Sequence, residues 1–456
     1  MTLPPGFESQ LSFLATEDLA QLKQSIAGTP ITSLRVNPNK WDQSVDLEKV
    51  PWSVGGYYLQ DRPMFTCDPL LHAGAYYVQE ASSMVIGHIL QLLMEDMEEA
   101  ALVLDLCAAP GGKSTDIMAN LRAEDVLLSN EVIQSRAKTL RENVTKWGGA
   151  NHLVSSNDPA DFRRLPGLFD VMLIDAPCSG EGLFRKDPEA VNEWSPEAVD
   201  LCQKRQQRIL ADAWPCLAAD GILIYATCTY NEAENEAVLC WLKRTYEVSP
   251  MTFSLETLGF QVSEVDGFPL YKAFPHRLKG EGFSFFVVRK KEVEESVTIR
   301  SGRKKKDSRK RMPIDAYLKQ PETDGFVQDS SLLYFEDLPL RDLLNSHLHL
   351  LKSGLRIGEI KKNKLVPDHE LAMSTHFHTG QYPEIELDYP QAIQYLRKES
   401  FELKAEVRGI HLVRYRGVGL GFINHLGNRF NSLYPAGYRI RTQACDGEPG
   451  ILCSGT

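Results

Sequence analysis

Residues 102 to 115 read Leu-Val-Leu-Asp-Leu-Cys-Ala-Ala-Pro-Gly-Gly-Lys-Ser-Thr, an apolar run that passes through a glycine turn into a helical pattern. A strand, turn and helix of this kind let the backbone approach a ligand closely at the positive end of a helix. The turn is not a P-loop, because Cys107 stands where that motif needs its first glycine, and it is not the G-x-G-x-x-G turn of NAD-binding proteins. A glycine turn alone is about as often only a tight turn, so its meaning depends on the rest of the chain.

Short apolar runs alternate with longer amphipathic stretches on both sides of this turn. The most distinct helix is predicted from Ser195 as N-cap and Pro196 in the first turn, and continues to Leu217. Such alternation is typical of a parallel sheet wrapped by helices. We therefore expect residues 100–290 to form one doubly wound, Rossmann-like α/β domain. Its strands are predicted at residues 102–106, 126–129, 153–154, 171–174, 222–226 and 283–288.

Three further segments flank this predicted domain. Residues 1–99 begin with a polar amphipathic stretch at 8–27 and continue with short extended runs, which predicts a small α+β domain. Residues 289–311 carry eleven basic and four acidic side chains, so a linker at 291–312 is expected to be either solvated or a basic arm that contacts phosphate. In residues 313–456, short apolar runs separated by glycine-rich turns predict a compact β-rich module.

Composition and charge limit the classes of function. The chain has 456 residues, is 43% hydrophobic and carries a formal net charge of -11, which excludes global disorder and argues against a protein that coats nucleic acid indiscriminately. Residues 289–311 and 397–441 nevertheless carry net charges of +7 and +6. Any nucleic acid would therefore be bound selectively by local patches. The second stretch also contains aromatic residues that could either stack on bases or pack in a core: Tyr415, Phe422, Phe430, Tyr434 and Tyr438.

The nine cysteines are an odd number spread thinly over the chain, and no two form a C-x-x-C pair. This pattern favours reduced thiols in the cytoplasm over a disulfide framework or a zinc ribbon. The N-terminus lacks the basic and apolar regions of a secretory signal, and no apolar run approaches the length of a membrane span, so no membrane is expected as a partner. His369, His376 and His378 lack the spacing of a zinc site, and no metal is expected.

Two acidic residues follow strands of the predicted α/β domain. Glu131 lies twenty residues beyond Gly111, where a doubly wound nucleotide site places the carboxylate that accepts from both ribose hydroxyls. Asp158 follows the third strand, in position for the polar edge of an adenine. Either residue could merely cap the next helix, but their shared register favours a nucleoside cofactor whose non-phosphate tail lies in the glycine turn. S-adenosylmethionine fits that description.

Two cysteines end neighbouring strands of the same domain. Cys178 follows Asp175 after the fourth strand, and Cys228 follows the fifth. Because adjacent parallel strands deliver their loops to one crevice, these three side chains can converge. Thiolate addition at C6 of a pyrimidine makes C5 nucleophilic enough to accept a methyl group, and a carboxyl group at N3 would stabilise the developing charge. Three cysteines on helical patterns are expected only to pack: Cys202, Cys216 and Cys240.

The sequences Cys107-Ala-Ala-Pro-Gly-Gly-Lys113, Asp175-Ala-Pro-Cys-Ser-Gly180 and Thr227-Cys-Thr229 together resemble the Nop/Sun family of RNA cytosine-C5 methyltransferases. Arg35-Val-Asn37 is similar to the family's N-terminal motif, and the chain length and C-terminal region look like the bacterial type F branch, which acts on small-subunit rRNA. The resemblance implies methylation of cytosine in RNA, with 16S rRNA or the 30S subunit as partner and a PUA-like RNA-binding module at about 400–456. We expect a cytoplasmic monomer.

The resemblance also implies roles for individual residues. Cys228 would be the nucleophile, Cys178 would assist adduct resolution and product release, and Asp175 would contact both the cytosine and the cofactor. Arg35 and Asn37 would contact the substrate. The S-adenosylmethionine site would be lined by Cys107, Ala108, Ala109, Pro110, Gly111, Gly112, Lys113, Glu131, Asp158 and Asp175.

Two alternatives use the same residues. DNA cytosine-C5 methyltransferases use the cysteine that follows proline as nucleophile, and this chain has both Pro177-Cys178 and Glu142-Asn-Val144. Here the Glu-Asn-Val element precedes the Pro-Cys loop and lies in a helical pattern at 133–146, so we interpret it as part of a helix surface. The other alternative is a catalytically idle RNA-binding or ribosome-assembly factor that kept the fold. Such a scaffold would require neither cysteine nor the glycine turn.

Overall fold

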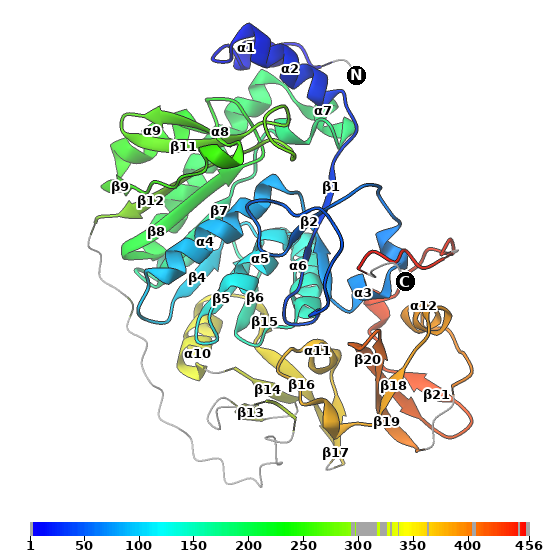
Figure 1. The fold of residues 1–456 in the computed structure, drawn as a ribbon. Coiled ribbons are helices and arrows are strands. Elements are labelled where there is room, and N and C mark those ends of the chain that lie inside the picture. Colours follow the sequence, from blue (N-terminus) through cyan, green and yellow to red (C-terminus); the bar gives the residue numbers. More distant parts are fainter. Residues whose placement is uncertain are drawn as a thin grey trace.

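The computed structural model describes residues 3–292, 297, 317–319, 326–328, 331–335, 337–362, 364–403, 407–445 and 447–452. Most of the predicted linker at 291–312 lies outside these residues. The described part contains a ten-stranded central sheet, a three-stranded sheet that precedes it, and two four-stranded sheets that follow it (Figure 1). None of the helices in this part is long and apolar enough to cross a membrane.

The central sheet has the Rossmann-like architecture expected for residues 100–290. Its strands are β4 (Leu102–Asp105), β5 (Val126–Asn130), β6 (His152–Ser155), β7 (Phe169–Asp175), β8 (Leu217–Thr227), β9 (Val248–Pro250), β10 (Gln261–Val265), β11 (Phe268–Ala273), β12 (Phe283–Lys290) and β15 (Leu350–Ser353). Their order is β10-β11-β12-β8-β7-β4-β5-β6-β15, with β9 paired to β12, and β4 to β8 are parallel. The chain runs outward from β4 to β6 and returns to β7 on the other side of β4. The topological switch point, where such folds bind ligands, therefore lies between β4 and β7.

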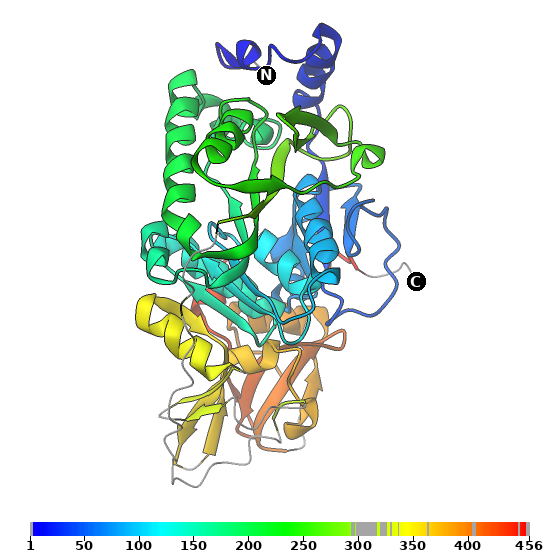
Figure 2. The ribbon, with the colours of Figure 1, turned by 90° about the vertical axis from the view of Figure 1, so that its left-hand side faces the viewer.

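Helices cover both faces of this sheet because alternate strand residues point to opposite sides. The helices are α4 (Val85–Glu95), α5 (Gly112–Asn120), α6 (Gln134–Trp147), α8 (Pro196–Ala213) and α9 (Glu236–Thr245). Leu104 and Met172 pack in the core that α8 and α9 cover, whereas Val103 and Val171 pack against α4 and α5. Figure 2 shows α8 and α4 on opposite sides of the strands. The predicted N-cap is confirmed, since the Ser195 side chain accepts from Ala198 N.

The N-terminal region forms the predicted small α+β unit. It contains α1 (Phe7–Gln10), α2 (Thr16–Ile26), β1 (Thr32–Val36), β2 (Gly56–Leu59), η1 (Phe65–Cys67), α3 (Pro69–His72) and β3 (Tyr76–Val78), with β1 between β2 and β3. The single amphipathic stretch expected at 8–27 is divided between α1 and α2, because Leu11 and Leu14 leave the helix to pack in a core with Trp194.

The C-terminal region contains more helix than its apolar runs predicted. One sheet comprises β13 (Phe326–Gln328), β14 (Ser331–Tyr334), β16 (Leu355–Lys361) and β17 (Lys364–Pro367), and the other comprises β18 (Glu384–Glu386), β19 (Gly409–Tyr415), β20 (Val418–His425) and β21 (Phe430–Ser432). The helices are α10 (Leu338–His347), α11 (His369–Met373) and α12 (Tyr389–Arg397). The last sheet starts at Glu384 rather than near residue 400, because β18 is a short polar strand that hydropathy does not reveal. Strand β15 pairs antiparallel with β6 and so joins the central sheet, which the sequence did not indicate.

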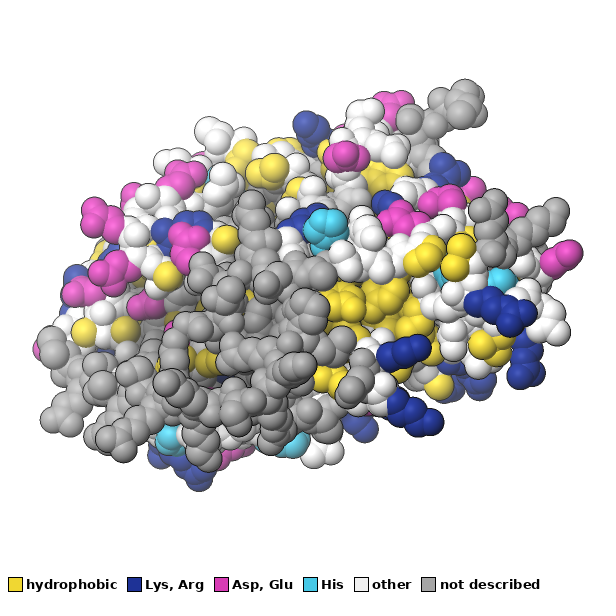
Figure 3. All heavy atoms as spheres, turned by 90° about the horizontal axis from the view of Figure 1, so that it is seen from below, with side chains coloured by type: hydrophobic (Ala, Val, Ile, Leu, Met, Phe, Trp, Pro, Cys, Tyr) yellow, Lys and Arg dark blue, Asp and Glu magenta, His cyan; other side chains and the backbone are white. Residues whose placement is uncertain are grey.

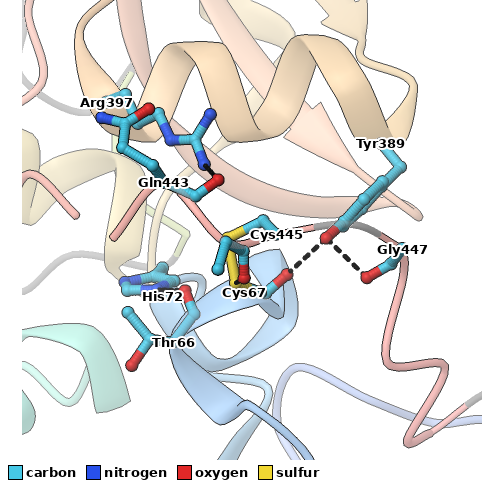
Figure 4. Close-up of a disulfide and its surroundings, with 9 residues drawn as sticks. Thr66, Cys67, His72, Tyr389, Arg397, Gln443, Cys445 and Gly447 are labelled. Carbon is cyan, nitrogen blue, oxygen red and sulfur yellow. Dashed lines mark hydrogen bonds between the residues drawn. A yellow bond between two sulfur atoms is a disulfide. The ribbon is translucent and has the colours of Figure 1, made fainter. Parts of the chain in front are cut away.

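Cys67 and Cys445 form a disulfide across 378 positions, so the expectation of only reduced thiols was wrong. The Tyr389 hydroxyl lies beside it, 3.2 Å from the carbonyl oxygen of Cys67 and 2.8 Å from that of Gly447 (Figure 4). The two cysteines meet because α3 and β1 share one apolar core with α12, β19 and β20. The disulfide therefore ties the N-terminal unit to the C-terminal tail.

Candidate active site

The predicted cofactor loop connects β4 to α5 at the switch point. Gly111 has φ of +111°, a left-handed conformation that favours glycine, and it directly precedes α5. Helix α6 holds the loop from outside, since Asn143 Nδ2 donates to Pro110 O (2.8 Å) and Arg136 Nη2 donates to Ala109 O (2.8 Å). The Glu142-Asn-Val144 element thus lies on a helix, as expected. Its Asn143 supports the loop.

A buried carboxylate lies beneath this loop. Asp105 is fully buried at the end of β4, and its Oδ2 accepts from Ser114 Oγ (2.7 Å). Its Oδ1 is buried without a hydrogen-bond partner in the described part of the chain. Burial raises the pKa of Asp105 to about 7. An unused buried acceptor at this position fits a ligand that brings a donor or a positive charge, and S-adenosylmethionine carries both.

Glu131 and Asp158 differ in burial and in the hydrogen bonds that their carboxylates accept. Glu131 is buried, and its Oε1 accepts from Ile133 N (2.9 Å), with Oε2 3.4 Å from Arg136 Nη1. Each of its oxygens can still accept a hydrogen bond from a ribose hydroxyl. Asp158 is half-exposed and acts as a helix cap, because its Oδ1 accepts from Ala160 N (3.0 Å). A role for Asp158 at an adenine stays a prediction.

Lys113 and Asp175 connect the cofactor loop to β7. Lys113 Nζ lies 2.7 Å from Asp175 Oδ2 and 5.0 Å from the centre of the Phe283 ring. Burial alone would lower the pKa of Lys113, but the attraction of Asp175 outweighs it, and the pKa is raised above its ordinary value. Lys113 therefore keeps its positive charge beside Asp175 at neutral pH.

The two predicted catalytic cysteines are adjacent free thiols. Their Sγ atoms lie 3.1 Å apart. They meet because β7 and β8 are parallel neighbours in which Asp175 lies opposite Ala226, so both loops leave the same edge of the sheet. The hydrogen bond to Cys228, together with burial, raises the pKa of Cys178 well above its ordinary value. Cys178 therefore keeps its proton and leaves Cys228 as the candidate thiolate.

The chain matches known proteins along nearly its whole described length. The family profile described as "16S rRNA methyltransferase RsmB/F" matches residues 91–289, and profiles for the N-terminal domain, the first C-terminal domain and the PUA domain of RsmF match 3–81, 314–374 and 382–440. The "Ribosomal RNA small subunit methyltransferase F" of Shewanella loihica is 31% identical over 421 residues, which cover 87% of this chain and 85% of the relative. The chain belongs to the RsmB/F family of 16S rRNA methyltransferases. The protein of the same name from Escherichia coli K12 is 30% identical, over 85% of this chain and 84% of the relative.

Solved structures support the methyltransferase fold of this RsmB/F member. A "Methyltransferase Homolog Protein from Pyrococcus horikoshii" is 25% identical with a TM-score of 0.52, and the match covers 62% of this chain and 94% of that one. The structure "NSun6 from Pyrococcus horikoshii with SFG" has a TM-score of 0.53 at 17% identity, over 62% of this chain and 97% of that one. The methyl donor of the RsmB/F enzyme is S-adenosylmethionine, as the residues at the strand ends predicted.

Arg35 and Asn37 lie inside this RsmB/F structure, packed against other parts of the chain. Both are buried, and Arg35 donates to Gln79 Oε1 (3.0 Å) and Thr115 Oγ1 (2.6 Å) and lies 3.3 Å from Asp116 Oδ1. Asn37 Nδ2 donates to two backbone carbonyls, those of residues 74 and 147. These side chains fasten β1 to α5 and α6. Their expected contact with RNA stays a prediction.

The basic C-terminal stretch combines a packed interior with charged side chains outside. The aromatic residues Tyr415, Phe422 and Tyr434 are buried, so they belong to the core and not to a stacking surface. The exposed basic residues of this stretch include Arg408, Arg416, Arg429, Arg439 and Arg441. Basic side chains gather on the right-hand side of the view in Figure 3, the side on which β18 to β21 lie. His369 is buried and packs against Tyr434 and Tyr438.

Sequence reasoning missed two buried glutamates beside the cysteines. Glu181 lies three positions after Cys178, and Glu234 lies six positions after Cys228. Both are fully buried and hydrogen-bonded to the opposite cysteine loop. The only sequence signal for these residues is an acidic side chain close to each cysteine. In a sequence, such a side chain cannot be told from a solvent-exposed helix cap.

Proposed function

We propose that this chain methylates C5 of cytosine in 16S rRNA through a covalent adduct between Cys228 and C6 of the base. The observation that carries this proposal is the 3.1 Å contact between the Cys178 and Cys228 thiols at the ends of neighbouring strands. This thiol pair follows the strand that ends in Asp175, the partner of Lys113 in the cofactor loop. A nucleophile and the methyl-donor site are thereby brought to one edge of the sheet.

The reaction steps follow from the weak nucleophilicity of C5 in an unmodified pyrimidine. S-adenosylmethionine supplies an electrophilic methyl group when bound. The Cys228 thiolate adds to C6, and the C5–C6 π electrons become available at C5 to form the new carbon–carbon bond. A base then takes the C5 proton. The electrons of the C5–H bond restore the C5–C6 double bond, and those of the C6–S bond leave with the Cys228 thiolate. The Lys113–Asp175 pair offers a proton and a positive charge at the edge of the ring, where negative charge develops in the adduct.

Cys178 supports the last step of this sequence. Its raised pKa keeps it protonated next to Cys228. A thiol donor 3.1 Å from the departing sulfur stabilises the thiolate as the C6–S bond breaks. Loss of that donor should therefore slow release of the product more than formation of the adduct.

The substrate must bring the base out of its stack to reach the partly buried thiol of Cys228. The exposed arginines of the last sheet, among them Arg408, Arg416 and Arg429, are suited to phosphate contact. We assign the 16S rRNA or the 30S subunit as the physiological partner of a cytoplasmic, monomeric enzyme. The idle assembly factor is disfavoured because such a protein has no need for two adjacent thiols beside a cofactor loop.

The test is to map 5-methylcytosine in 16S rRNA from cells with and without the gene. The proposal expects at least one modified position to be lost, and to return with the intact gene but not with Cys228→Ala. Purified protein should then be offered naked 16S rRNA and 30S subunits separately. An unchanged methylation map, together with no methyl transfer to either substrate, would contradict the proposal.

A further inference from the structure

Two buried glutamates link the loops that carry the two thiols, and each glutamate binds the opposite loop. Glu181 lies on the loop of Cys178, directly after Gly180, and Glu234 lies on the loop of Cys228. Neither side chain is exposed to solvent. The connections run in both directions between the two loops.

Glu181 accepts hydrogen bonds from three successive residues after Cys228. Its Oε2 accepts from Thr229 Oγ1 (2.5 Å), Tyr230 N (2.8 Å) and Asn231 N (3.0 Å). Its Oε1 accepts from Asn231 Nδ2 (2.9 Å) and Trp194 Nε1 (3.1 Å). The segment that begins immediately after the proposed nucleophile is thus fixed by one carboxylate.

Glu234 binds in the opposite direction. Its carboxylate accepts from the backbone N–H and the hydroxyl of Ser179, the residue that follows Cys178. Gln206 Nε2 (2.7 Å) and Asn231 Nδ2 (2.8 Å) complete its set of donors. Asn231 therefore donates to both glutamates and joins them into one network.

The network is built from neutral donors. Within the described residues, neither glutamate has an ion-pair partner, and burial raises the pKa of Glu234. A buried polar group requires full hydrogen bonding to be tolerated, and in return such a network fixes its members in one arrangement. Apolar side chains could fill the same space without fixing the separation of two loops. Burying two carboxylates costs free energy. A role in holding the thiols in position explains why the protein keeps them there.

We propose that Glu181 and Glu234 are positioning residues that set the distance between Cys178 and Cys228. This inference rests on the proposed roles of the two cysteines in methyl transfer. The reciprocal bonds begin one residue after each thiol, at Ser179 and Thr229, so a change in either carboxylate shifts its thiol directly. A further bond, from Gly182 N to Cys228 O (2.9 Å), closes the link at the backbone.

The experiment measures the thiol separation without relying on methyl transfer. Wild type, Glu181→Gln and Glu234→Gln are treated with diamide, a diazene oxidant that accepts two electrons and two protons as the thiols form a disulfide. The Cys178–Cys228 crosslink is followed by peptide mass spectrometry. Single-turnover methyl transfer is measured on the same proteins at saturating RNA and S-adenosylmethionine. Asp125→Asn is the control, because Asp125 is also a buried carboxylate with backbone donors, which it combines with an ion pair to Arg122, and it lies directly before β5.

Both glutamine variants should form the crosslink and transfer the methyl group roughly 10- to 100-fold more slowly, with an unchanged KM for RNA. Asp125→Asn should stay within about twofold of wild type in both assays. Wild-type rates in both glutamine variants would overturn the inference. Where a glutamine variant does not fold, Ser179→Ala and Thr229→Ala remove one donor each and should slow both assays, and wild-type rates there would overturn it equally. If crosslinking depends on the glutamates while Cys228→Ala still methylates RNA, the proposed nucleophile is wrong and the positioning role stands.

Discussion

Lys113 Nζ lies 2.7 Å from Asp175 Oδ2, so the helix that follows the cofactor loop is joined to the strand that leads to Cys178. The two residues come from opposite sides of the switch point between β4 and β7. With the proposed roles of these residues, one ion pair would couple binding of the methyl donor to placement of the target base.

Replacing Lys113 tests that coupling. Lys113→Met should lower the methyl-transfer rate at saturating substrates at least tenfold, because Asp175 loses the cation that orients it. The free energy of unfolding should change by about 1 kcal/mol or less, since the pair is partly exposed. Lys243→Met is a matched control, as its ion pair with Asp266 lies away from the site. A wild-type rate in Lys113→Met would contradict the coupling.

Asp105 should make stability depend on pH. Burial raises its pKa from 3.8 to about 7, so between these values the folded protein holds a proton that the unfolded chain has released. The stabilisation is complete below pH 3.8 and is lost as the pH rises toward 7. Asp105→Asn does not titrate, and it should gain roughly 2 to 3 kcal/mol relative to wild type between pH 5 and pH 8. Urea unfolding at both pH values checks this, and a constant difference would show that Asp105 is already ionised in the folded protein.

Arg35 should affect folding and not RNA affinity. Arg35→Met leaves the buried carboxylate of Asp116 without its cation, which should destabilise the protein by about 3 to 5 kcal/mol in urea unfolding. Arg277→Met, which removes an exposed ion pair with Asp18, should have little effect. If Arg35→Met unfolds like wild type and instead loses RNA binding, the substrate contact suggested by the sequence motif is correct.

The convergence of Asp175, Cys178 and Cys228 could be predicted because parallel neighbouring strands end at the same edge of a sheet. Glu131 was predicted from the place of the carboxylate after the second strand of a doubly wound site, and its contact with a ribose stays a prediction. The ion pair of Arg35 with Asp116 was not predicted, because a basic motif looks the same whether it faces RNA or a buried carboxylate on α5. Burial of this kind depends on contacts between distant segments, which local sequence does not encode.

The features that the sequence did not predict also depend on contacts between distant segments. Cys67 and Cys445 are 378 positions apart in the sequence and pair where α3 and α12 meet. No rule of sequence spacing reaches that far. Glu181 and Glu234 stand next to glycine or asparagine and resemble ordinary caps in the sequence. Only the fold shows that each binds the loop of the other.

The disulfide predicts a specific pattern of thiol reactivity. Under non-reducing, denaturing conditions, iodoacetamide should modify Cys178 and Cys228 but not Cys67 or Cys445. Reduction should make Cys67 and Cys445 available to iodoacetamide. It should also make the C-terminal tail more sensitive to protease, because the tail loses its covalent link to η1. Cys67→Ser should reproduce the sensitivity of the reduced protein. Alkylation of Cys67 and Cys445 before reduction would contradict the pairing.

The most direct test of the central claim is a denaturing gel of enzyme mixed with labelled 16S rRNA and S-adenosylmethionine. Cys178→Ala should accumulate a protein–RNA adduct that survives denaturation, because Cys228 still adds to C6 while release is slowed. Cys228→Ala and the double variant should form no adduct and transfer no methyl group. Methylation of cytosine by Cys228→Ala would contradict the assignment of Cys228 as the nucleophile.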